Sequence, residues 1–411
     1  MTVHSTITPD IDQMQACRRH IHQHPELGFE EFATSRLVAE RLEEWGYEVH
    51  TGIAATGVVG VLRWGDSSGP RLGLRADMDA ALPIIQEETG LPWASQVPGK
   101  MHACGHDGHT AILLGAAEAL ARQHREQRLP GSGTLNLIFQ PAEELGGGGG
   151  AQRMIEDGLF ERFPCDALYA LHNFPGKPVG QLCFREGAFM ASSDTVTLTF
   201  IGKGGHGALP QLAADPTLPA AATVLALQSI VGRNVDPNLV SVISVGRMQA
   251  GTTANVIPNS AELELSVRTL DPEVRDTLER RIRTLAESQA ESFDCRCEIN
   301  YLRGYPVLIN TPAETQLAID TAREMFGNEL VEAPTAPLTG SEDCAYFLEQ
   351  VPGCYFIVGN GDNGHSEGLP LGPCSVHNPH YDFNDDCMGP AATFLMGLVS
   401  RYFSQGPSRS E

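Results

Sequence analysis

The sequence MHACGHDGHT, residues 101–110, places three histidines, one cysteine and one aspartate within ten positions. Imidazole and thiolate groups at this density suit zinc, manganese, cobalt or nickel better than calcium or magnesium, which prefer oxygen ligands. Glycines between these groups let the backbone bend tightly and aim several side chains at one point. A single Cys or His is more often a packed or surface residue, but five such groups together predict a site for a divalent metal.

Three further segments supply candidate ligands, and each follows an apolar run or lies in a loop. They are Gln140–Glu144 (QPAEE), Leu171–Asn173 (LHN) and Val376–Phe383 (VHNPHYDF). In open α/β sheets, binding sites form outside the carboxyl ends of the strands. The pattern therefore predicts a metal site that is assembled from several strand ends.

Composition limits the class of function. A chain of 411 residues with 42% hydrophobic residues is long enough for two domains and a sizeable core. Its formal net charge of −23 argues against nucleic acid or an anionic membrane as a partner, because both require a basic surface. The net charge says little about a small substrate, which responds to local charge.

Cysteine usage and hydropathy indicate a reducing cytoplasm. The ten cysteines show no disulfide-like spacing, and the N-terminal MTVHSTITPDIDQ lacks the basic start and apolar core of a signal peptide. No apolar run approaches the roughly 20 residues that are needed to span a bilayer.

Hydrophobic periodicity predicts strands that alternate with helices, as in βαβ units with a mostly parallel sheet. Helices are expected at 10–23, 30–45, 110–123, 150–158, 311–326, 342–349 and 388–402, and strands at 58–62, 71–75, 134–139, 167–172 and 355–358. Between Asp194 and Leu302 the order becomes β-α-β-β-α-β, which is the ferredoxin-like arrangement. The predicted fold is an α/β domain of residues 1–190 and 303–411, with helices on both faces of its sheet and residues 191–302 inserted as a compact α+β domain.

Further local expectations concern the surroundings of the metal motif. Asp77 and Asp79 follow a predicted strand, and they either fix a ligand histidine or cap the next turn. The dipole of the helix expected at 110–123 favours a thiolate at Cys104. The five glycines at 146–150 predict a local flexible loop.

Nine motifs in one order resemble the M20 metallopeptidase family, in the branch of hippurate hydrolases, N-acyl-amino-acid amidohydrolases and auxin-conjugate hydrolases. The resemblance runs nearly end to end, and the nine together are very specific although any one alone would be weak. The motifs are HPELGFEE (24–31), LRADMDA (74–80), MHACGHDGHT (101–110), QPAEE (140–144), LHN (171–173), GKGGHGALP (202–210), TANVIPNSAEL (253–263), GSED (340–343) and HNPHYDFND (377–385).

The resemblance implies a role for each matching residue of the metal site. The residues that match the family's metal ligands, for one or two ions of Mn, Zn, Co or Ni, are Cys104, His106, Glu144, His172 and His377. Glu143 matches the general base, which would take a proton from metal-activated water. The division of roles between the two adjacent glutamates rests on the resemblance, because spacing alone leaves Glu143 open as a second carboxylate of an acidic turn.

The resemblance also implies that the inserted domain is a dimerisation or lid domain, so a homodimer or a dimer-based tetramer is expected. In the family this domain often supplies a histidine to the partner's active site, where it stabilises an oxyanion, and His206 matches it. Asn255 and Arg268 resemble the groups that hold the substrate's carboxylate. The plainer alternatives are a polar residue in a glycine-rich turn for His206 and a solvated strand residue for Arg268.

The expected function is metal-dependent hydrolysis of an N-acyl amino acid to a carboxylic acid and an amino acid, with benzoylglycine (hippurate) ahead of acetyl and indole-acetyl substrates. The alternatives are a metallo-dipeptidase, which needs a pocket for a free α-amino group, and a non-catalytic binding protein. Loss of Glu143 or of a ligand would favour the latter, and none is lost. A longer loop after Asp79, together with Gln211 and Asn378, departs from the family pattern and leaves the acyl group open.

Overall fold

The computed structural model describes residues 7–66, 68–81, 85–361 and 374–405. Contacts divide the chain into one compact unit of Met1–Gly187, Ile309–Ala336 and Tyr346–Glu411 and a second of Ala188–Leu308 and Pro337–Ala345. The boundaries expected from the sequence assigned 303–411 to the first domain as a whole, whereas Pro337–Ala345 groups with the second unit. Residues 82–84 of the loop after Asp79 lie outside the described residues.

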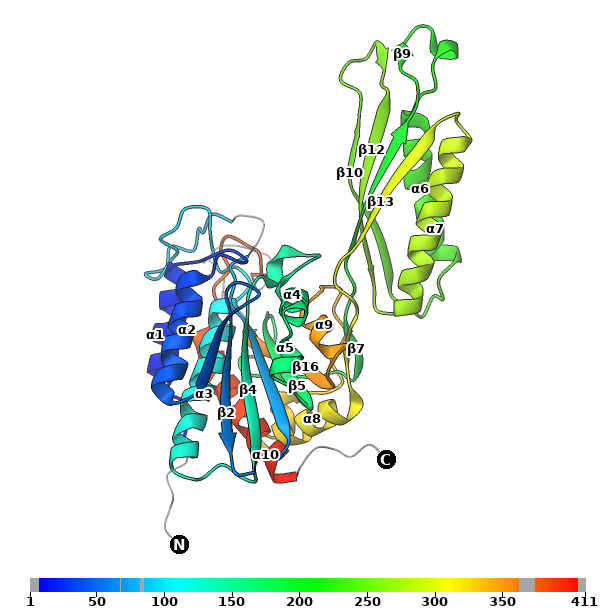
Figure 1. Ribbon diagram of the computed structural model, residues 1–411. Coiled ribbons are helices and arrows are strands. Elements are labelled where there is room, and N and C mark those ends of the chain that lie inside the picture. Colours follow the sequence, from blue (N-terminus) through cyan, green and yellow to red (C-terminus); the bar gives the residue numbers. More distant parts are fainter. Residues whose placement is uncertain (1–6, 67, 82–84, 362–373, 406–411) are drawn as a thin grey trace. The chain divides into compact units, whose positions relative to one another are not determined.

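The first unit is built on an eight-stranded mixed sheet (Figure 1). Strands β4, β3, β5 and β16 at its centre are mutually parallel, so their carboxyl ends meet at one edge, and this confirms the predicted α/β fold class. The strands in spatial order are β1 (Glu48–Ile53), β2 (Gly57–Trp64), β4 (Gly133–Gln140), β3 (Arg71–Asp77), β5 (Ala167–Pro175), β16 (Gly353–Gly361), β6 (Leu182–Cys183) and β15 (Val331–Glu332).

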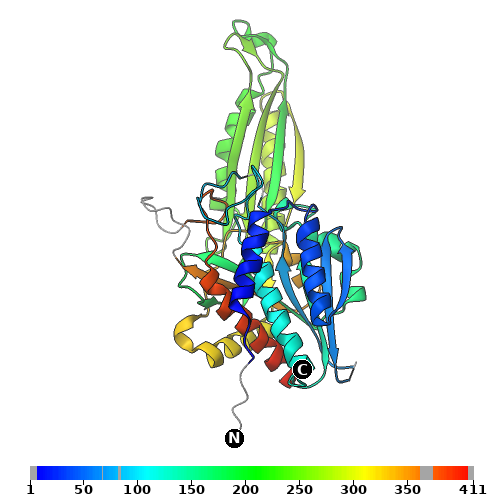
Figure 2. The same ribbon diagram turned by 90° about the vertical axis from the view of Figure 1, so that its left-hand side faces the viewer.

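Helices cover both faces of this sheet. One face carries α1 (Ile11–Gln23), α2 (Phe32–Trp45), α3 (His106–Arg125), α8 (Pro312–Phe326) and α10 (Met388–Gln405). Figure 2 shows α1, α3 and α10 side by side. The other face carries α4 (Gly150–Glu156), α5 (Leu159–Arg162) and α9 (Cys344–Leu348).

The core explains why these segments form strands and helices. Leu72 and Leu74 of β3 alternate with residues of the opposite face and are completely buried under the α3 side of the sheet. Helix α1 begins where the Asp10 side chain accepts a hydrogen bond from the Gln13 N–H, and it ends before His24, which precedes a proline. In the described part of the chain, no helix combines the length and the apolar character needed to cross a membrane.

The second unit contains a four-stranded antiparallel sheet that α6 (Thr217–Arg233) and α7 (Pro272–Glu291) cover. Its strands in spatial order are β10 (Ser241–Ala250), β12 (Ser260–Thr269), β8 (Asp194–Ile201) and β13 (Arg296–Arg303). The chain order β8-α6-β10-β12-α7-β13 is the predicted β-α-β-β-α-β arrangement. Side chains that alternate along β8 fill its core, namely Val196, Leu198 and Phe200.

Short elements complete the description. They are the strands β7 (Gly187–Met190), β9 (Gly205–His206), β11 (Val256–Ile257) and β14 (Leu308–Asn310), and the 3-10 helices Glu143–Leu145, Pro210–Leu212, Asn328–Leu330 and Asp385–Cys387. The strands that the sequence did not predict are β1 and several of two to four residues, which are too short for a clear periodicity.

The glycine run at 146–150 is only partly a loop, because Gly150 is the first residue of α4. A Cβ atom at Gly150 would lie 1.6 Å from the carbonyl oxygen of Pro141. The Gly150 N–H also donates to the Ala142 carbonyl at 3.0 Å. The start of α4 therefore packs directly against the QPAEE segment, and the close approach requires glycine.

We expect Gly150→Ala to lower the free energy of unfolding by about 1–3 kcal/mol, because the added methyl group forces the Pro141 backbone to move. Gly232→Ala in α6 is the matched control, since nothing lies within 4 Å of the added Cβ there. That control should be neutral or stabilising by up to about 1 kcal/mol. Urea unfolding followed by circular dichroism measures both, and equal stability of Gly150→Ala and wild type would contradict the packing argument.

Candidate metal centre

The candidate ligands lie where three neighbouring parallel strands end. Strand β3 ends at Asp77, β4 leads into Glu143 and Glu144, and β5 carries His172 near its carboxyl end. Because β3 lies between β4 and β5, side chains that follow these strands meet at one edge of the sheet, as the strand-end pattern predicted.

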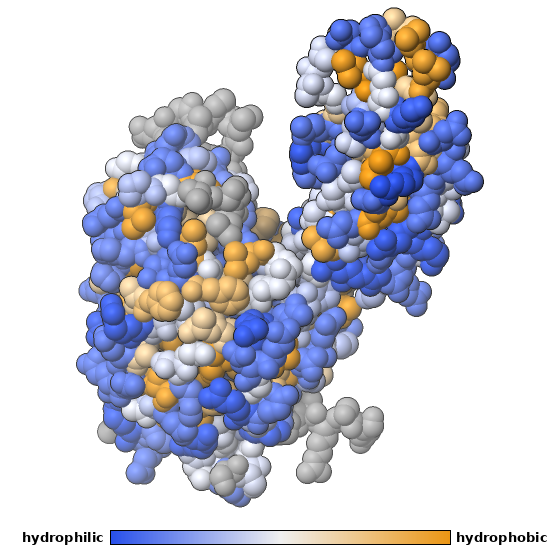
Figure 3. Space-filling view, turned by 45° about the horizontal axis from the view of Figure 1, so that its top comes forward, coloured by the Kyte–Doolittle hydropathy of each residue, from blue (hydrophilic) through white to orange (hydrophobic). Residues whose placement is uncertain are grey.

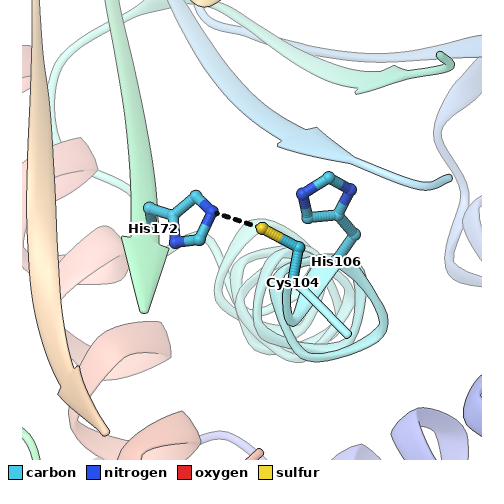
Figure 4. A group of neighbouring side chains, drawn as sticks. All are labelled: Cys104, His106 and His172. Carbon is cyan, nitrogen blue, oxygen red and sulfur yellow. Dashed lines mark hydrogen bonds between the residues drawn. The ribbon is translucent and has the colours of Figure 1, made fainter. Parts of the chain in front are cut away.

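Cys104 and His106 lie at the start of α3 (Figure 4). The helix begins one turn earlier than the predicted 110–123, because Gly105 adopts a left-handed φ of 98° and turns the chain into the helix. A Cβ atom at Gly105 would lie 2.2 Å from Oδ1 of Asn173 and 2.9 Å from Oη of Tyr381. Glycine is therefore required for Cys104 to approach the end of β5.

Two groups of donor atoms converge and share one thiol. Cys104 Sγ lies 3.3 Å from Nε2 of His172 (Figure 4), and Nε2 of His377 lies 2.8 Å from Oε1 of Glu144. Donor atoms lie within 4.8 Å of one another in the group Cys104, His106 and His172, and also in the group Cys104, Glu144 and His377. The structure thus brings together all five residues that resemble the family's ligands.

A third group, Asp77, His106 and His109, is equally close but its carboxylate is already engaged. Asp77 Oδ1 lies 2.6 Å from Nδ1 of His109, and Oδ2 accepts a hydrogen bond from Nη1 of Arg75 at 2.7 Å. His109 Nε2 in turn accepts the N–H of Asn173 at 3.0 Å. Asp77 and His109 therefore position the end of β5. The sequence pattern did not predict this role for His109, although His109 lies three residues after His106 on the same helix face.

Asp79 fixes two of the donor-bearing segments. Its Oδ1 lies 3.2 Å from Nδ1 of His106, and its Oδ2 accepts the backbone N–H of Glu144 at 2.9 Å. This contact sets the ring orientation of His106, whose Nε2 is buried and has no hydrogen-bond partner. Of the two interpretations of Asp77 and Asp79, the one in which they orient histidines agrees with the structure.

Glu31 holds the turn that carries the two glutamates. Its Oε1 accepts the N–H of Ala142 at 2.8 Å, and its Oε2 accepts the hydroxyl of Thr56 at 2.5 Å. Burial and then the charge of Asp79 raise the pKa of Glu31 to about 7. The HPELGFEE segment thus supports the QPAEE turn, a role that the sequence pattern alone did not reveal.

Nearby carboxylates raise the pKa values of two donor groups when no cation is bound. Burial raises the pKa of the Cys104 thiol well above its usual range, and Glu144 and Glu143 raise it further. The expectation that the helix dipole holds Cys104 as a thiolate is therefore wrong for the metal-free protein. Burial lowers the pKa of His106, but the charges of Asp77 and Asp79 outweigh this effect and raise it to about 10.

These features fit a divalent cation. Thiol and imidazole donors suit zinc, manganese, cobalt or nickel, and the buried Nε2 of His106 has no hydrogen-bond partner. A cation would also offset the buried carboxylate charge and favour the thiolate form of Cys104. The residues present can therefore hold the metal that the sequence predicts.

His206, Asn255 and Arg268 belong to the second unit. Strand β9 pairs with β11, so His206 lies opposite Val256, and the Gly207 N–H donates to the Asn255 carbonyl at 2.8 Å. His206 Nδ1 accepts the N–H of Ala208 at 3.1 Å, which leaves Nε2–H as a donor in the neutral ring.

Arg268 is half-buried, and its Nη1 donates to the Ser341 hydroxyl at 3.1 Å. Burial lowers the pKa of its guanidinium, and the charge of Asp194 partly offsets this. The side chain is therefore more restrained than that of an ordinary solvated strand residue.

Comparison with known proteins identifies the family. Residues 73–401 match the model of Peptidase family M20/M25/M40. The chain belongs to this family. It is 43% identical over 390 residues to a hippurate hydrolase of Campylobacter jejuni, with 95% of this chain and 96% of the relative covered. It is also 38% identical to an IAA-amino acid hydrolase of Arabidopsis thaliana, with 97% and 89% covered. The resemblance read from the nine motifs is confirmed.

Solved structures of M20 proteins have the same fold. A dinuclear metal-binding peptidase of the family from Bacillus subtilis matches with a TM-score of 0.79 at 31% identity, covering 95% of this chain and 97% of that one. The M20 assignment thus agrees with the arrangement of both the sheet and its helices.

Glu31→Gln should make the metal-free protein relatively more stable at neutral pH. The pKa of Glu31 rises from its ordinary 4.5 to about 7 on folding, so the stability that its protonated form contributes is complete below pH 4.5 and is lost as the pH rises through 7. Glutamine resembles the protonated acid at every pH, so the variant does not lose this stability as the pH rises. Between pH 4.5 and about pH 7, the free energy of unfolding of the variant should rise relative to that of the wild type by up to about 3 kcal/mol. Denaturant titrations at several pH values measure the gap, and a gap independent of pH would contradict the assignment.

Proposed function

We propose that this M20 protein is a metal-dependent amidohydrolase that cleaves N-acyl amino acids into a carboxylic acid and a free amino acid. The observation that carries the proposal is the convergence of five donors from four chain segments beside the buried carboxylate of Glu143. The hippurate hydrolase at 43% identity supports a linear N-acyl amino acid, with benzoylglycine as the leading substrate.

One or two divalent ions, of Mn, Zn, Co or Ni, are assigned to these donors, namely Cys104, His106, Glu144, His172 and His377. Cys104 belongs to two of the donor groups, so its thiol would be able to hold metal together with either set of partners. The dinuclear M20 relative from Bacillus subtilis supports two ions. Bound metal supplies a Lewis acid that lowers the pKa of water toward about 7 and polarises a carbonyl group.

Glu143 is assigned to proton transfer. Its side chain is buried, and its Oε2 lies 4.0 Å from Nε2 of His106, with which it and Glu144 form a further group of close donor atoms. A carboxylate at this place takes a proton from the attacking water and delivers it to the amide nitrogen as the C–N bond breaks. Glu144 is assigned to the metal instead, because its carboxylate lies beside both Cys104 and His377.

Substrate-binding roles are assigned to three residues of the second unit by family resemblance. Arg268 donates through Nη1 to the Ser341 hydroxyl, and a guanidinium restrained in this way suits a substrate carboxylate. Asn255 is assigned to the same carboxylate. His206 presents Nε2–H as a donor, which suits the stabilisation of an oxyanion in the active site of a partner copy.

Glu143→Gln should lower kcat by about 10²- to 10⁴-fold, because the proton carrier is lost, while metal content stays at the wild-type level. Glu144→Gln is the matched comparison and should lose metal. Amine release is measured from benzoyl, acetyl and indole-acetyl amino acids and from dipeptides, after metal removal and reloading with Mn, Co, Zn or Ni.

The outcomes separate the alternatives. Full turnover by Glu143→Gln would overturn its role in proton transfer. Turnover of dipeptides alone would indicate a metallo-dipeptidase. If the folded, metal-loaded protein releases no amine from any of these substrates, the result would favour a non-catalytic binding protein.

We also propose that the chain forms a homodimer, or a tetramer built from dimers, through its second unit. Helix α6 exposes Leu218 and Leu225, the latter by 76%, and Arg233 is its single charged residue. The adjacent strand β10 lies at one edge of the sheet and exposes Met248. Apolar side chains appear on the surface of the second unit in Figure 3. Exposed apolar residues next to an open strand edge support self-association.

Leu225→Glu should convert the dimer to a monomer, because it places a charge in the proposed contact. Leu302→Glu changes an equally apolar, exposed residue of the opposite edge strand β13 and should leave the dimer intact. Light scattering coupled to size exclusion measures both. A monomeric wild type, or dimers in both variants, would contradict the proposed interface.

A cytoplasmic location is proposed as well. All ten cysteines are free thiols, which a reducing compartment maintains.

A further inference from the structure

A second cluster of buried charged side chains lies between α1, α3 and the segment before α10. Arg18 and Asp107 have completely buried side chains, and Asp385 is only 11% exposed. Arg18 Nε donates to Asp385 Oδ1 at 2.7 Å, and Arg18 Nη1 lies 3.6 Å from Asp107 Oδ2. The same Asp107 oxygen lies 2.9 Å from Nδ1 of His22. One guanidinium thus joins two carboxylates of different segments.

Each of these carboxylates adjoins a segment that bears assigned metal ligands. Asp107 directly follows His106 in the first turn of α3. Asp385 closes the HNPHYDFND motif, which begins with His377. Helix α1 carries none of the assigned ligands, so Arg18 links two ligand-bearing segments without being one of them.

The cluster is not arranged for maximal stability. Several of its buried polar atoms have no hydrogen-bond partner, namely Arg18 Nη1 and Nη2 and Asp107 Oδ1. Each such atom destabilises the folded state, and well-packed apolar side chains are often at least as stable as a buried ionic group. A role in geometry accounts for the cluster better than a role in stability does.

We propose that Arg18 is a positioning residue of the metal centre, whose guanidinium holds the first turn of α3 and the C-terminal ligand segment in register. Through it, Cys104 and His106 on one segment and His377 on the other reach a common metal site. The inference rests on the proposed metal-dependent function. This positioning role requires the planar guanidinium of arginine, because the ammonium group of lysine is a point charge that does not hold two carboxylates in a fixed geometry.

Arg19 provides a matched control on the same helix. It binds the same Asp385, through Nη2 and Oδ2 at 2.8 Å, but its side chain is 32% exposed. Its guanidinium stacks on Trp93 at 3.6 Å from the ring centroid. Among the described residues it forms no ion pair with Asp107, so it does not link the two ligand segments.

The test compares metal dissociation constants of wild type, Arg18→Met, Arg18→Lys and Arg19→Met, measured by competition with a chromophoric chelator and Zn or Mn. Thermal unfolding of each metal-free variant is recorded in parallel. Arg18→Met should bind metal about 10- to 100-fold more weakly, as expected when support of the ligands is lost. Arg18→Lys should also bind more weakly than wild type, and Arg19→Met should bind like wild type.

Equal metal affinity of Arg18→Met and Arg19→Met would overturn the inference, even if Arg18→Met unfolds at a lower temperature, because that result indicates a structural role alone. If Arg18→Met does not fold, Arg18→Lys decides in the same way against Arg19→Met. A wild-type protein that binds neither metal would contradict the proposed function instead, so the two failures are distinguishable.

Discussion

The carboxylate of Asp79 holds two donor-bearing segments at once, and the geometry of the metal centre depends on this link. One oxygen orients His106 at the start of α3, and the other accepts the backbone N–H of Glu144 after β4. Both contacts are possible because Asp79 follows β3, which lies between β4 and β5 in the sheet. The order of three strands thus determines which side chains meet.

The carboxylates around the donors also control the protonation of the donors. Burial and the neighbouring acids keep Cys104 protonated and favour a protonated His106, although a metal needs the thiolate and the neutral ring. A cation must therefore displace protons as it binds. The affinity for metal therefore depends on the pH of the solution.

Much of this fold and site was predictable from local patterns. The alternation of apolar and polar residues along β8 correctly predicted a strand of the second unit's sheet. The positions of Glu144 and His172 at strand ends correctly predicted that the donors lie close together. The start of α3 was predicted a turn too late, at Thr110, because the left-handed turn at Gly105 packs against Asn173 of a distant strand. The support by Glu31 and Arg18 was not predictable, since it arises from contacts between residues far apart in the chain.

The donors are spread from Cys104 to His377, and the whole second unit is encoded between them. During synthesis on the ribosome, the strand β16 that pairs with β5 and the segment that carries His377 emerge only after the second unit. The second unit, whose sheet is contained within 194–303, has its complete sequence earlier. The nascent chain therefore displays an incomplete set of donors until His377 has emerged, and full metal loading requires that segment.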